Sequence, residues 1–363
     1  MDHWFILSER GLPGPGSHVA WPFNYEFEDL LCRLTAARIL APEFLAPLKS
    51  IRRAPVIGRP LSRFLGKVAD RYTSVELPAR GPGKRILFVT TIAPYGLKAV
   101  EAISDWRKEF DLVLGYVVDA FPLPAGYPEA IVKQYDHLFV SVPERVEILQ
   151  KGLGIPVTPL PLACDVVRFG SGSAARSIDV LAYGRQRQSY IKIIDEHFLA
   201  ERNRRLYLSG FSHSRESVWM QTRLQFWQVA RSTRISLAFA PDSSELRFEG
   251  LPAVTGRWFE GLTAGCLMVG KPPDSPFFRQ WFDWTDACVD LPDDPSQAPD
   301  FIESLLDDPH RLHAAHARNY RTMLQRHDWR HRIAQIMQAT GLNPPETLVR
   351  ELAVLPSLQL SNT

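Results

Sequence analysis

A regular alternation of short apolar runs with helical segments limits the folds that this chain can adopt. The alternation runs from Arg85 to about Leu162, and it begins again at Ile178 and continues to about Thr340. A short apolar run has the length of a strand that is covered on both faces. Strands that alternate with helices predict a parallel, doubly wound sheet, so the sequence predicts an α/β fold.

A stretch of small residues from Phe169 to Ser177 separates the two series. Such a composition is typical of a domain linker, and a chain of 363 residues is long enough for two domains. We therefore expect an N-terminal domain over residues 1–169, a C-terminal domain over residues 170–340 and a tail over residues 341–363.

Composition excludes several classes of function. The formal net charge of +2 gives no general attraction to nucleic acid, and no apolar run approaches the ~20 residues that span a bilayer. The four cysteines are scattered without metal-ligand spacing, and His310, His313 and His316 are expected on a helix surface. Together with an N-terminus that does not resemble a signal peptide, these features indicate a cytoplasmic protein without a metal site.

A basic segment over residues 49–71 allows two interpretations. Lysines and arginines alternate there with apolar residues, which fits a peripheral contact with the inner face of a membrane or with an anionic acceptor. The other interpretation is a solvated helix face, interrupted by Pro55 and Pro60.

Residues 255–271 contain a predicted helix and strand that matter most for function. Thr255 is expected to cap the helix, and Gly265 is expected to end it with a positive φ. Arg257 and Glu260 are three residues apart and share one helix surface. A glutamate can accept from two ribose hydroxyls and an arginine can bind an anion, although a plain surface ion pair is the alternative.

Other candidates follow strands near the start of the chain. Gly14 lies in a glycine-rich loop after an apolar run, although the spacing is not the dinucleotide-binding fingerprint. Asp119 ends a buried strand where ligands meet α/β sheets, so it is a candidate base, with a turn cap as the alternative. His18 is a second candidate base.

Four segments in order resemble the group-1 (GT4-like and CgeB-like) glycosyltransferases of the GT-B fold. They are residues 135–165, 178–185, 257–265 and 327–332, which include Arg257-Trp-Phe-Glu-Gly-Leu-Thr-Ala-Gly265 and His327-Asp-Trp-Arg-His-Arg332. The resemblance implies two Rossmann-like domains that face each other across a cleft. It also implies a metal-independent hexosyltransferase without a cofactor, which moves a sugar from a nucleotide-diphosphate sugar to a glycan or lipid-linked acceptor.

The resemblance also assigns roles in the donor site. Glu260 corresponds to the carboxylate that holds the donor ribose. The group that binds the donor diphosphate corresponds to the loop after the strand 178–183 and the helix that follows it. Its members are Gly184, Arg185 and either Arg187 or Lys192, and Arg257 assists them.

One departure from the family pattern affects the reaction. An earlier glutamate usually stands eight positions before the ribose glutamate, and here that position is Pro252. A retaining and an inverting outcome therefore both stay open. The departure also keeps a second function open, a non-catalytic glycosyltransferase-like binding subunit of a glycan-assembly complex.

Overall fold

The computed structural model describes residues 2–11, 21–45, 71–211, 219–241 and 248–358. The chain divides into two compact units, Met1–Pro159 and Leu160–Thr363. The first unit thus ends with its last strand, whereas the sequence placed the boundary after residue 169. The basic segment over residues 49–71, except Arg71, lies outside the described residues.

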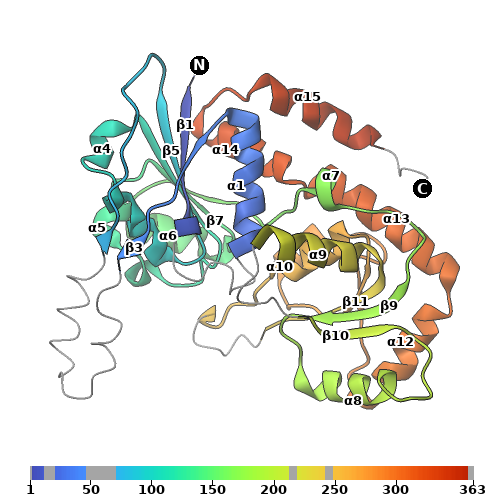
Figure 1. The fold of residues 1–363 in the computed structure, drawn as a ribbon. Coiled ribbons are helices and arrows are strands. Elements are labelled where there is room, and N and C mark those ends of the chain that lie inside the picture. The colour runs from blue at the N-terminus through green and yellow to red at the C-terminus, as the bar shows by residue number, and fades with distance from the viewer. Residues whose placement is uncertain (1, 12–20, 46–70, 212–218, 242–247, 359–363) are drawn as a thin grey trace, which may run out of the picture. The chain divides into compact units, whose positions relative to one another are not determined.

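The first unit contains a parallel six-stranded sheet in the order β2-β1-β5-β6-β7-β8 (Figure 1). A two-stranded antiparallel sheet joins β3 and β4. The strands are β1 His3–Leu7, β2 Arg38–Leu40, β3 Phe44–Leu45, β4 Arg71–Tyr72, β5 Arg85–Thr91, β6 Leu112–Val117, β7 His137–Val140 and β8 Val157–Pro159. The helices are η1 Glu9–Gly11, α1 Trp21–Thr35, η3 Pro94–Ala102, α4 Trp106–Glu109, η4 Pro124–Gly126, α5 Glu129–Val132, η5 Pro143–Arg145 and α6 Val146–Leu153.

The first sheet confirms the α/β prediction, because β5 is buried at every residue and β6 at every residue but its first. The segment between β5 and β6 does not form one continuous helix. The 3-10 helix η3 ends at Ala102, and Asp105 then adopts a left-handed conformation with φ of 48° before α4 begins. A residue with positive φ cannot continue a right-handed helix, so the segment breaks into two pieces.

The second unit contains a parallel five-stranded sheet in the order β10-β9-β11-β12-β13. The strands are β9 Ile178–Tyr183, β10 Tyr207–Phe211, β11 Thr233–Phe239, β12 Leu267–Lys271 and β13 Cys288–Asp290. The helices are α7 Val166–Phe169, α8 Gln188–Phe198, α9 Trp219–Arg231, α10 Gly256–Thr263, α11 Pro276–Trp281, η7 Pro295–Gln297, α12 Ala298–Leu306, α13 Pro309–Arg326, α14 Trp329–Thr340, α15 Glu346–Val354 and η8 Leu355–Ser357.

The core of the second unit lies between its sheet and the helices α8, α12 and α13. Buried residues of β9, β11 and β12 meet apolar residues of these helices in one cluster, which includes Val180, Leu237, Val269, Ile194 and Ile302. Every residue of β9 and all but one residue of β11 are buried, so both faces of these strands are covered. This explains why the strands appear in the sequence as continuous apolar runs.

The turn after α10 confirms one expectation and corrects another. Gly265 has φ of 78°, and a Cβ there would lie 2.1 Å from the carbonyl oxygen of Ser171, so glycine is required. Thr255 does occupy the N-cap position of α10, but its hydroxyl makes no cap hydrogen bond. The predicted capping bond is therefore wrong, although the helix begins where it was expected.

The segment that enters the second unit pairs with the start of α14. The Cys164 amide donates to the His327 carbonyl at 3.2 Å, and the Trp329 amide donates to the Cys164 carbonyl at 2.9 Å. Arg330 Nη1 contacts carboxylate oxygens of Asp165 at 2.9 Å and Asp328 at 2.8 Å. Residues 135–165 and 327–332, two of the segments that carry the family resemblance, are therefore joined by hydrogen bonds in the fold.

Residues 341–363 were expected to form a tail, but they contain the helix α15. Leu348 of this helix is buried, and Glu351 accepts from Arg330 Nε at 2.6 Å. The helix is therefore part of the second unit, packed against α14.

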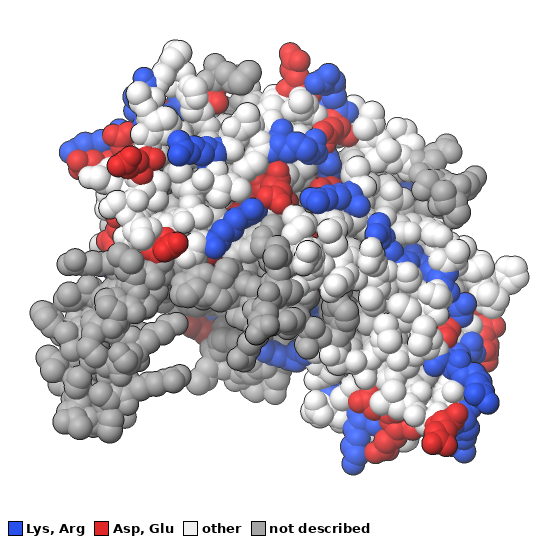
Figure 2. Space-filling view, viewed as in Figure 1, with Lys and Arg blue, Asp and Glu red and all other residues white. Residues whose placement is uncertain are grey.

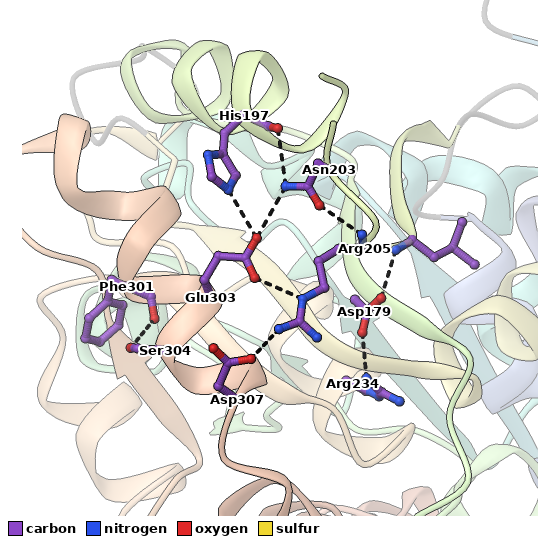
Figure 3. Close-up of polar contacts among 10 residues, drawn as sticks. Asp179, His197, Asn203, Arg205, Arg234, Phe301, Glu303, Ser304 and Asp307 are labelled. Carbon is purple, nitrogen blue, oxygen red and sulfur yellow. Dashed lines mark hydrogen bonds and ion pairs between the residues drawn. The ribbon is translucent and has the colours of Figure 1, made fainter. Parts of the chain in front are cut away.

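Ion pairs join the strands at the amino-terminal edge of the second sheet (Figure 3). Asp179 at the start of β9 accepts from Arg234 Nη1 at 2.6 Å and from the Leu206 amide at 2.8 Å. Arg205 Nε donates to Glu303 of α12 at 2.9 Å, and Arg205 also pairs with Asp307. These charges are neutralised by one another, which indicates a structural role for this edge.

Figure 2 shows that acidic and basic side chains are interspersed over the visible face of each unit. This distribution agrees with the small net charge of +2. Among the described helices, none is long and apolar enough to span a bilayer.

Candidate functional site

A pocket of about 840 Å³ lies at the carboxyl ends of β9, β11 and β12. Its wall comes from the residues that follow these strands and from the loop before α10, namely Arg185, Gln186, Arg187, Phe239, Ala240, Pro241, Gly250, Pro252, Pro272, Pro273 and Asp274. In the sheet order, β9 lies between β10 and β11. The chain therefore adds β10 on one side of β9 and the later strands on the other side, and the order of the strands reverses beside this pocket. Ligands of open α/β sheets bind at such a switch point.

Two exposed arginines give the pocket positive charge. Arg185 and Arg187 line it from the loop between β9 and α8, and Arg187 is the N-cap residue of α8. The first amides of a helix lack partners within the helix and carry partial positive charge, so a helix start and nearby guanidinium groups favour an anion. Gly184, which begins this loop, has φ of 66°, a value that glycine adopts without strain.

Lys192 does not belong to this group. It lies in α8 beyond the loop, with its side chain 79% exposed and its ammonium 4.0 Å from Glu196. The pocket wall does not include it. Of the two predicted partners of Arg185, the structure therefore places Arg187 at the pocket and Lys192 on the solvent-facing surface of α8.

Arg257 supports the pocket wall by hydrogen bonds to the backbone of two of its residues. Its guanidinium donates to the Arg185 carbonyl, and Nη2 donates to the Phe239 carbonyl at 3.2 Å. Its Cδ lies so close to Gly184 that a Cβ there would be 3.1 Å away. Burial lowers the pKa of Arg257, and nearby Tyr183 and Glu260 oppose that shift. Arg257 thus joins the ends of β9 and β11.

Glu260 has different partners from those that the sequence suggested. Its Oε1 accepts a charged hydrogen bond from Arg223 Nη1, and its Oε2 accepts from the Tyr183 hydroxyl at 3.2 Å. Both members of the ion pair are buried, with 3% of the Arg223 side chain and 9% of the Glu260 side chain exposed, and neither belongs to the pocket wall. The alternative of a surface pair between Arg257 and Glu260 is therefore wrong.

The sequence analysis did not single out Arg223 and Tyr183, although the residues around each of them indicate a special position. Tyr183 is the last residue of the predicted strand that precedes the arginine loop. Arg223 lies on the apolar face of α9, because Phe226, Trp227 and Ala230 follow it at three, four and seven positions and are buried. A charge within an apolar helix face implies a buried partner, which here is Glu260.

The first unit contains the remaining predicted residues. Asp119 follows β6, and its amide donates to the Ile92 carbonyl at 2.7 Å. It therefore lies at the carboxyl edge of the first sheet, as expected, and its role as a base stays a prediction. Gly14 and His18 lie outside the described residues.

Glu9 is another carboxylate at the same edge, and sequence reasoning did not single it out. It follows β1 and accepts from Thr91 Oγ1 at 2.8 Å, from the Ile92 amide at 3.0 Å and from Trp21 Nε1 at 2.7 Å. Burial raises the pKa of Glu9, and these three hydrogen bonds oppose the shift. Its position two residues after an apolar strand was the available signal.

Comparison with known proteins gives one match in sequence. Residues 187–338 match the family model described as glycosyl transferase-like. A sequence search of curated proteins found no match. The matched residues begin at Arg187 and include α8, α10 and the α14 segment, so they contain most of the donor site that the resemblance implied.

Solved structures are similar in fold at low sequence identity. The N-terminal domain of trehalose-6-phosphate phosphatase from Candida albicans aligns with a TM-score of 0.52 and 9% identity, over 93% of this chain and 98% of that one. HepE from Anabaena in complex with UDP-glucose aligns with a TM-score of 0.48 and 10% identity, over 93% and 99%. A glycosyltransferase from Rickettsia africae gives 0.46 and 11%, over 96% and 98%.

The fold and the sequence match agree with each other. Each unit is a parallel sheet with helices, which is the Rossmann-like half of a GT-B fold. The match over residues 187–338 falls on the unit that contains the arginine-lined pocket. The second unit is thus glycosyl transferase-like in sequence, and the chain resembles the group-1 glycosyltransferases of the GT-B fold.

Proposed function

We propose that this protein is a glycosyltransferase that moves a hexosyl group from a nucleotide-diphosphate sugar to an acceptor. The observation that carries the proposal is the pocket at the switch point of the second sheet, with Arg185 and Arg187 at the start of α8. Its volume, about 840 Å³, is that of a small-molecule site. The glycosyl transferase-like match over the same unit supports it.

Each side of this pocket has a proposed task. The α8 amides and the two arginines bind the diphosphate, whose negative charge grows as the bond to the sugar breaks. Arg257 keeps the Arg185 loop in place through its bond to the Arg185 carbonyl. Glu260, beside the end of β9, accepts from the ribose hydroxyls. These groups stabilise the leaving nucleotide without a metal ion or another cofactor.

We assign binding of the acceptor to the first unit. A glycan or a lipid-linked acceptor would be deprotonated by a base, for which Asp119 and His18 are the candidates. Pro252 lines the donor pocket where the family usually has a glutamate, so retention and inversion of the sugar configuration both stay open. A cytoplasmic location, with a membrane contact through residues 49–71, is part of the same hypothesis.

A second candidate function is a glycosyltransferase-like subunit that binds the nucleotide but does not transfer the sugar. The observation that favours it is the same Pro252, since a pocket wall without that carboxylate has lost a group beside the sugar. Release of the nucleoside diphosphate from the donor in the presence of acceptor distinguishes the two functions, because a binding subunit would release none.

The first prediction tests the diphosphate site. Arg185→Ala should weaken binding of a nucleoside diphosphate about ten- to a hundredfold, because charge-assisted hydrogen bonds contribute about 1.5–3 kcal/mol. Binding of the corresponding nucleoside should change little. Thermal-shift titration with UDP, GDP, ADP and their nucleosides measures both, since a ligand at a hundred times its Kd adds ~2.7 kcal/mol of stability.

Arg326→Ala is a matched control, because Arg326 is a partly exposed arginine of the same unit that pairs with Asp283, and neither residue lines the pocket. It should leave all titrations unchanged. Equal losses for the diphosphate and the nucleoside in Arg185→Ala would show that this arginine supports the fold rather than the phosphates. No stabilisation of the wild-type protein by any of the nucleotides would contradict the proposed function itself.

A further inference from the structure

We propose that Arg223 is a positioning residue that orients Glu260 toward the donor ribose, with Tyr183 as its second support. The proposal rests on the proposed function and deepens it, because it assigns selectivity for the ribose to a residue outside the pocket wall. Arg223 comes from α9, 37 positions before Glu260 in sequence, and contacts its carboxylate directly.

The carboxylate of Glu260 is fixed at both oxygens. Arg223 Nη1 donates to Oε1, and the Tyr183 hydroxyl lies 3.2 Å from Oε2. A carboxylate oxygen has two lone pairs, so each oxygen keeps one acceptor position after these contacts. Two hydroxyls on adjacent ribose carbons require two acceptor positions in a fixed orientation, which such a carboxylate provides.

Arg223 is itself held by apolar neighbours. Its guanidinium carbon lies 4.9 Å from the ring centroids of Phe226 and of Trp227, both buried residues of α9. The Tyr183 ring lies 4.9 Å from the Phe226 ring, so the second support packs against the same cluster. Cation–π contacts of this kind orient a guanidinium strongly where solvent is excluded.

The position of Tyr183 connects the cluster to the pocket. Tyr183 is the last residue of β9, and Gln186 Nε2 of the pocket wall donates to its carbonyl at 2.7 Å. Its hydroxyl also lies 3.4 Å from the carbonyl of Arg257, which supports the Arg185 loop. Loss of Arg223 would therefore leave Glu260 held at Oε2 alone, by the Tyr183 hydroxyl, while Arg257 still supports the Arg185 loop.

The alternative is a purely structural ion pair, and the two interpretations differ in one measurable quantity. A structural pair affects stability but not the preference for a ribonucleotide over its 2′-deoxy form. A positioning residue affects that preference, and its effect disappears once Glu260 has been replaced.

The experiment measures binding of UDP, ADP and GDP, each paired with its 2′-deoxy form, to the full chain by calorimetry. Wild type should prefer the ribonucleotide about ten- to a hundredfold, and Glu260→Gln should lose most of this preference. Arg223→Met should lose it to a similar extent, and the double variant should be no worse than Glu260→Gln alone. Arg223→Lys, which keeps the charge, should restore part of it.

Arg234→Met is the matched control for stability. It removes another arginine that pairs with a carboxylate, Asp179, in the same unit but at the amino-terminal end of the sheet. It should lower the thermal midpoint without changing the preference for ribose. Tyr183→Phe, which removes a single neutral donor, provides a readout if Arg223→Met does not fold, and its preference should fall about two- to tenfold.

Three results would overturn the proposal at different levels. If Arg223→Met, Arg223→Lys and Tyr183→Phe all keep the wild-type preference while Glu260→Gln loses it, Arg223 is structural and only the positioning role fails. If wild type binds nucleotides without a preference for ribose, Glu260 is not the ribose ligand. If wild type binds no nucleotide, the proposed function fails as a whole.

Discussion

At the residue scale, His316 shows how burial changes the chemistry of a side chain. Helical spacing with His310 and His313 predicted a surface position, but His316 is completely buried. Its Nδ1 lies 2.8 Å from the Gly265 carbonyl and therefore donates to it. Burial, together with the positive charge of Arg176, lowers the pKa of His316 to about 3. The expected surface position is wrong, since α13 packs this face against α10.

This shift predicts a loss of stability in acid. The folded pKa lies below the unfolded value of about 6.5, so protonation favours the unfolded chain, and stability falls as pH decreases below about 6.5 toward 3. At pH 5 the loss should be about 2 kcal/mol relative to pH 7. Urea unfolding at both pH values should show a smaller loss for His316→Gln, which has no titrating ring. An equal loss in both proteins would contradict the assignment.

At the element scale, a buried charge cluster joins the entry segment of the second unit to α14. Asp328 is completely buried, and its Oδ2 accepts from the Val166 amide at 2.9 Å. Arg330 neutralises Asp328 and Asp165 together. Burial raises the pKa of Asp328, and the positive charge of Arg330 opposes that shift. Without the arginine, two carboxylates would remain buried and uncompensated.

Arg330→Met should therefore destabilise the second unit by about 3–5 kcal/mol, the cost of leaving one partner of a buried ion pair alone. Arg279→Met removes an exposed pair and should change stability by less than about 1 kcal/mol. Urea midpoints of the two variants measure the difference. Similar midpoints would show that the cluster around Arg330 does not stabilise the second unit.

At the scale of the whole molecule, two doubly wound units are combined in one chain. The second has the order β10-β9-β11-β12-β13, whose switch point lies beside the arginine-lined pocket. The proposed sugar transfer needs positive charge for the leaving diphosphate, and we assign that task to Arg185, Arg187 and the start of α8. The facing of the two units across a cleft stays a prediction.

The whole-molecule prediction concerns metal ions. If arginines and helix amides stabilise the diphosphate, nucleotide binding by the full chain should keep its Kd within about twofold when EDTA is added. Calorimetric titration with and without the chelator measures this, with the Arg185→Ala protein as a weak-binding reference. Loss of binding with EDTA, followed by recovery with Mn²⁺ or Mg²⁺, would show that a metal ion is required.

The repeating α/β pattern of this protein follows from local sequence alone. Strand β9 has the predicted bounds, Ile178–Tyr183, and Gly265 has the predicted positive φ. These features depend on neighbouring residues, because apolar runs and a backbone without Cβ act locally. The arginines after β9 were also predictable, since a loop after a parallel strand must lie at the carboxyl edge of its sheet.

Which charged side chains meet depends on how the helices pack. Arg257 and Glu260 are neighbours on α10, yet Arg257 binds backbone carbonyls while Glu260 pairs with Arg223 from α9. In the same way, Arg330 of α14 reaches Asp165, which lies 165 positions earlier. A buried charge must find a partner where packing has excluded water, and that partner is set by which helices pack together rather than by distance along the chain.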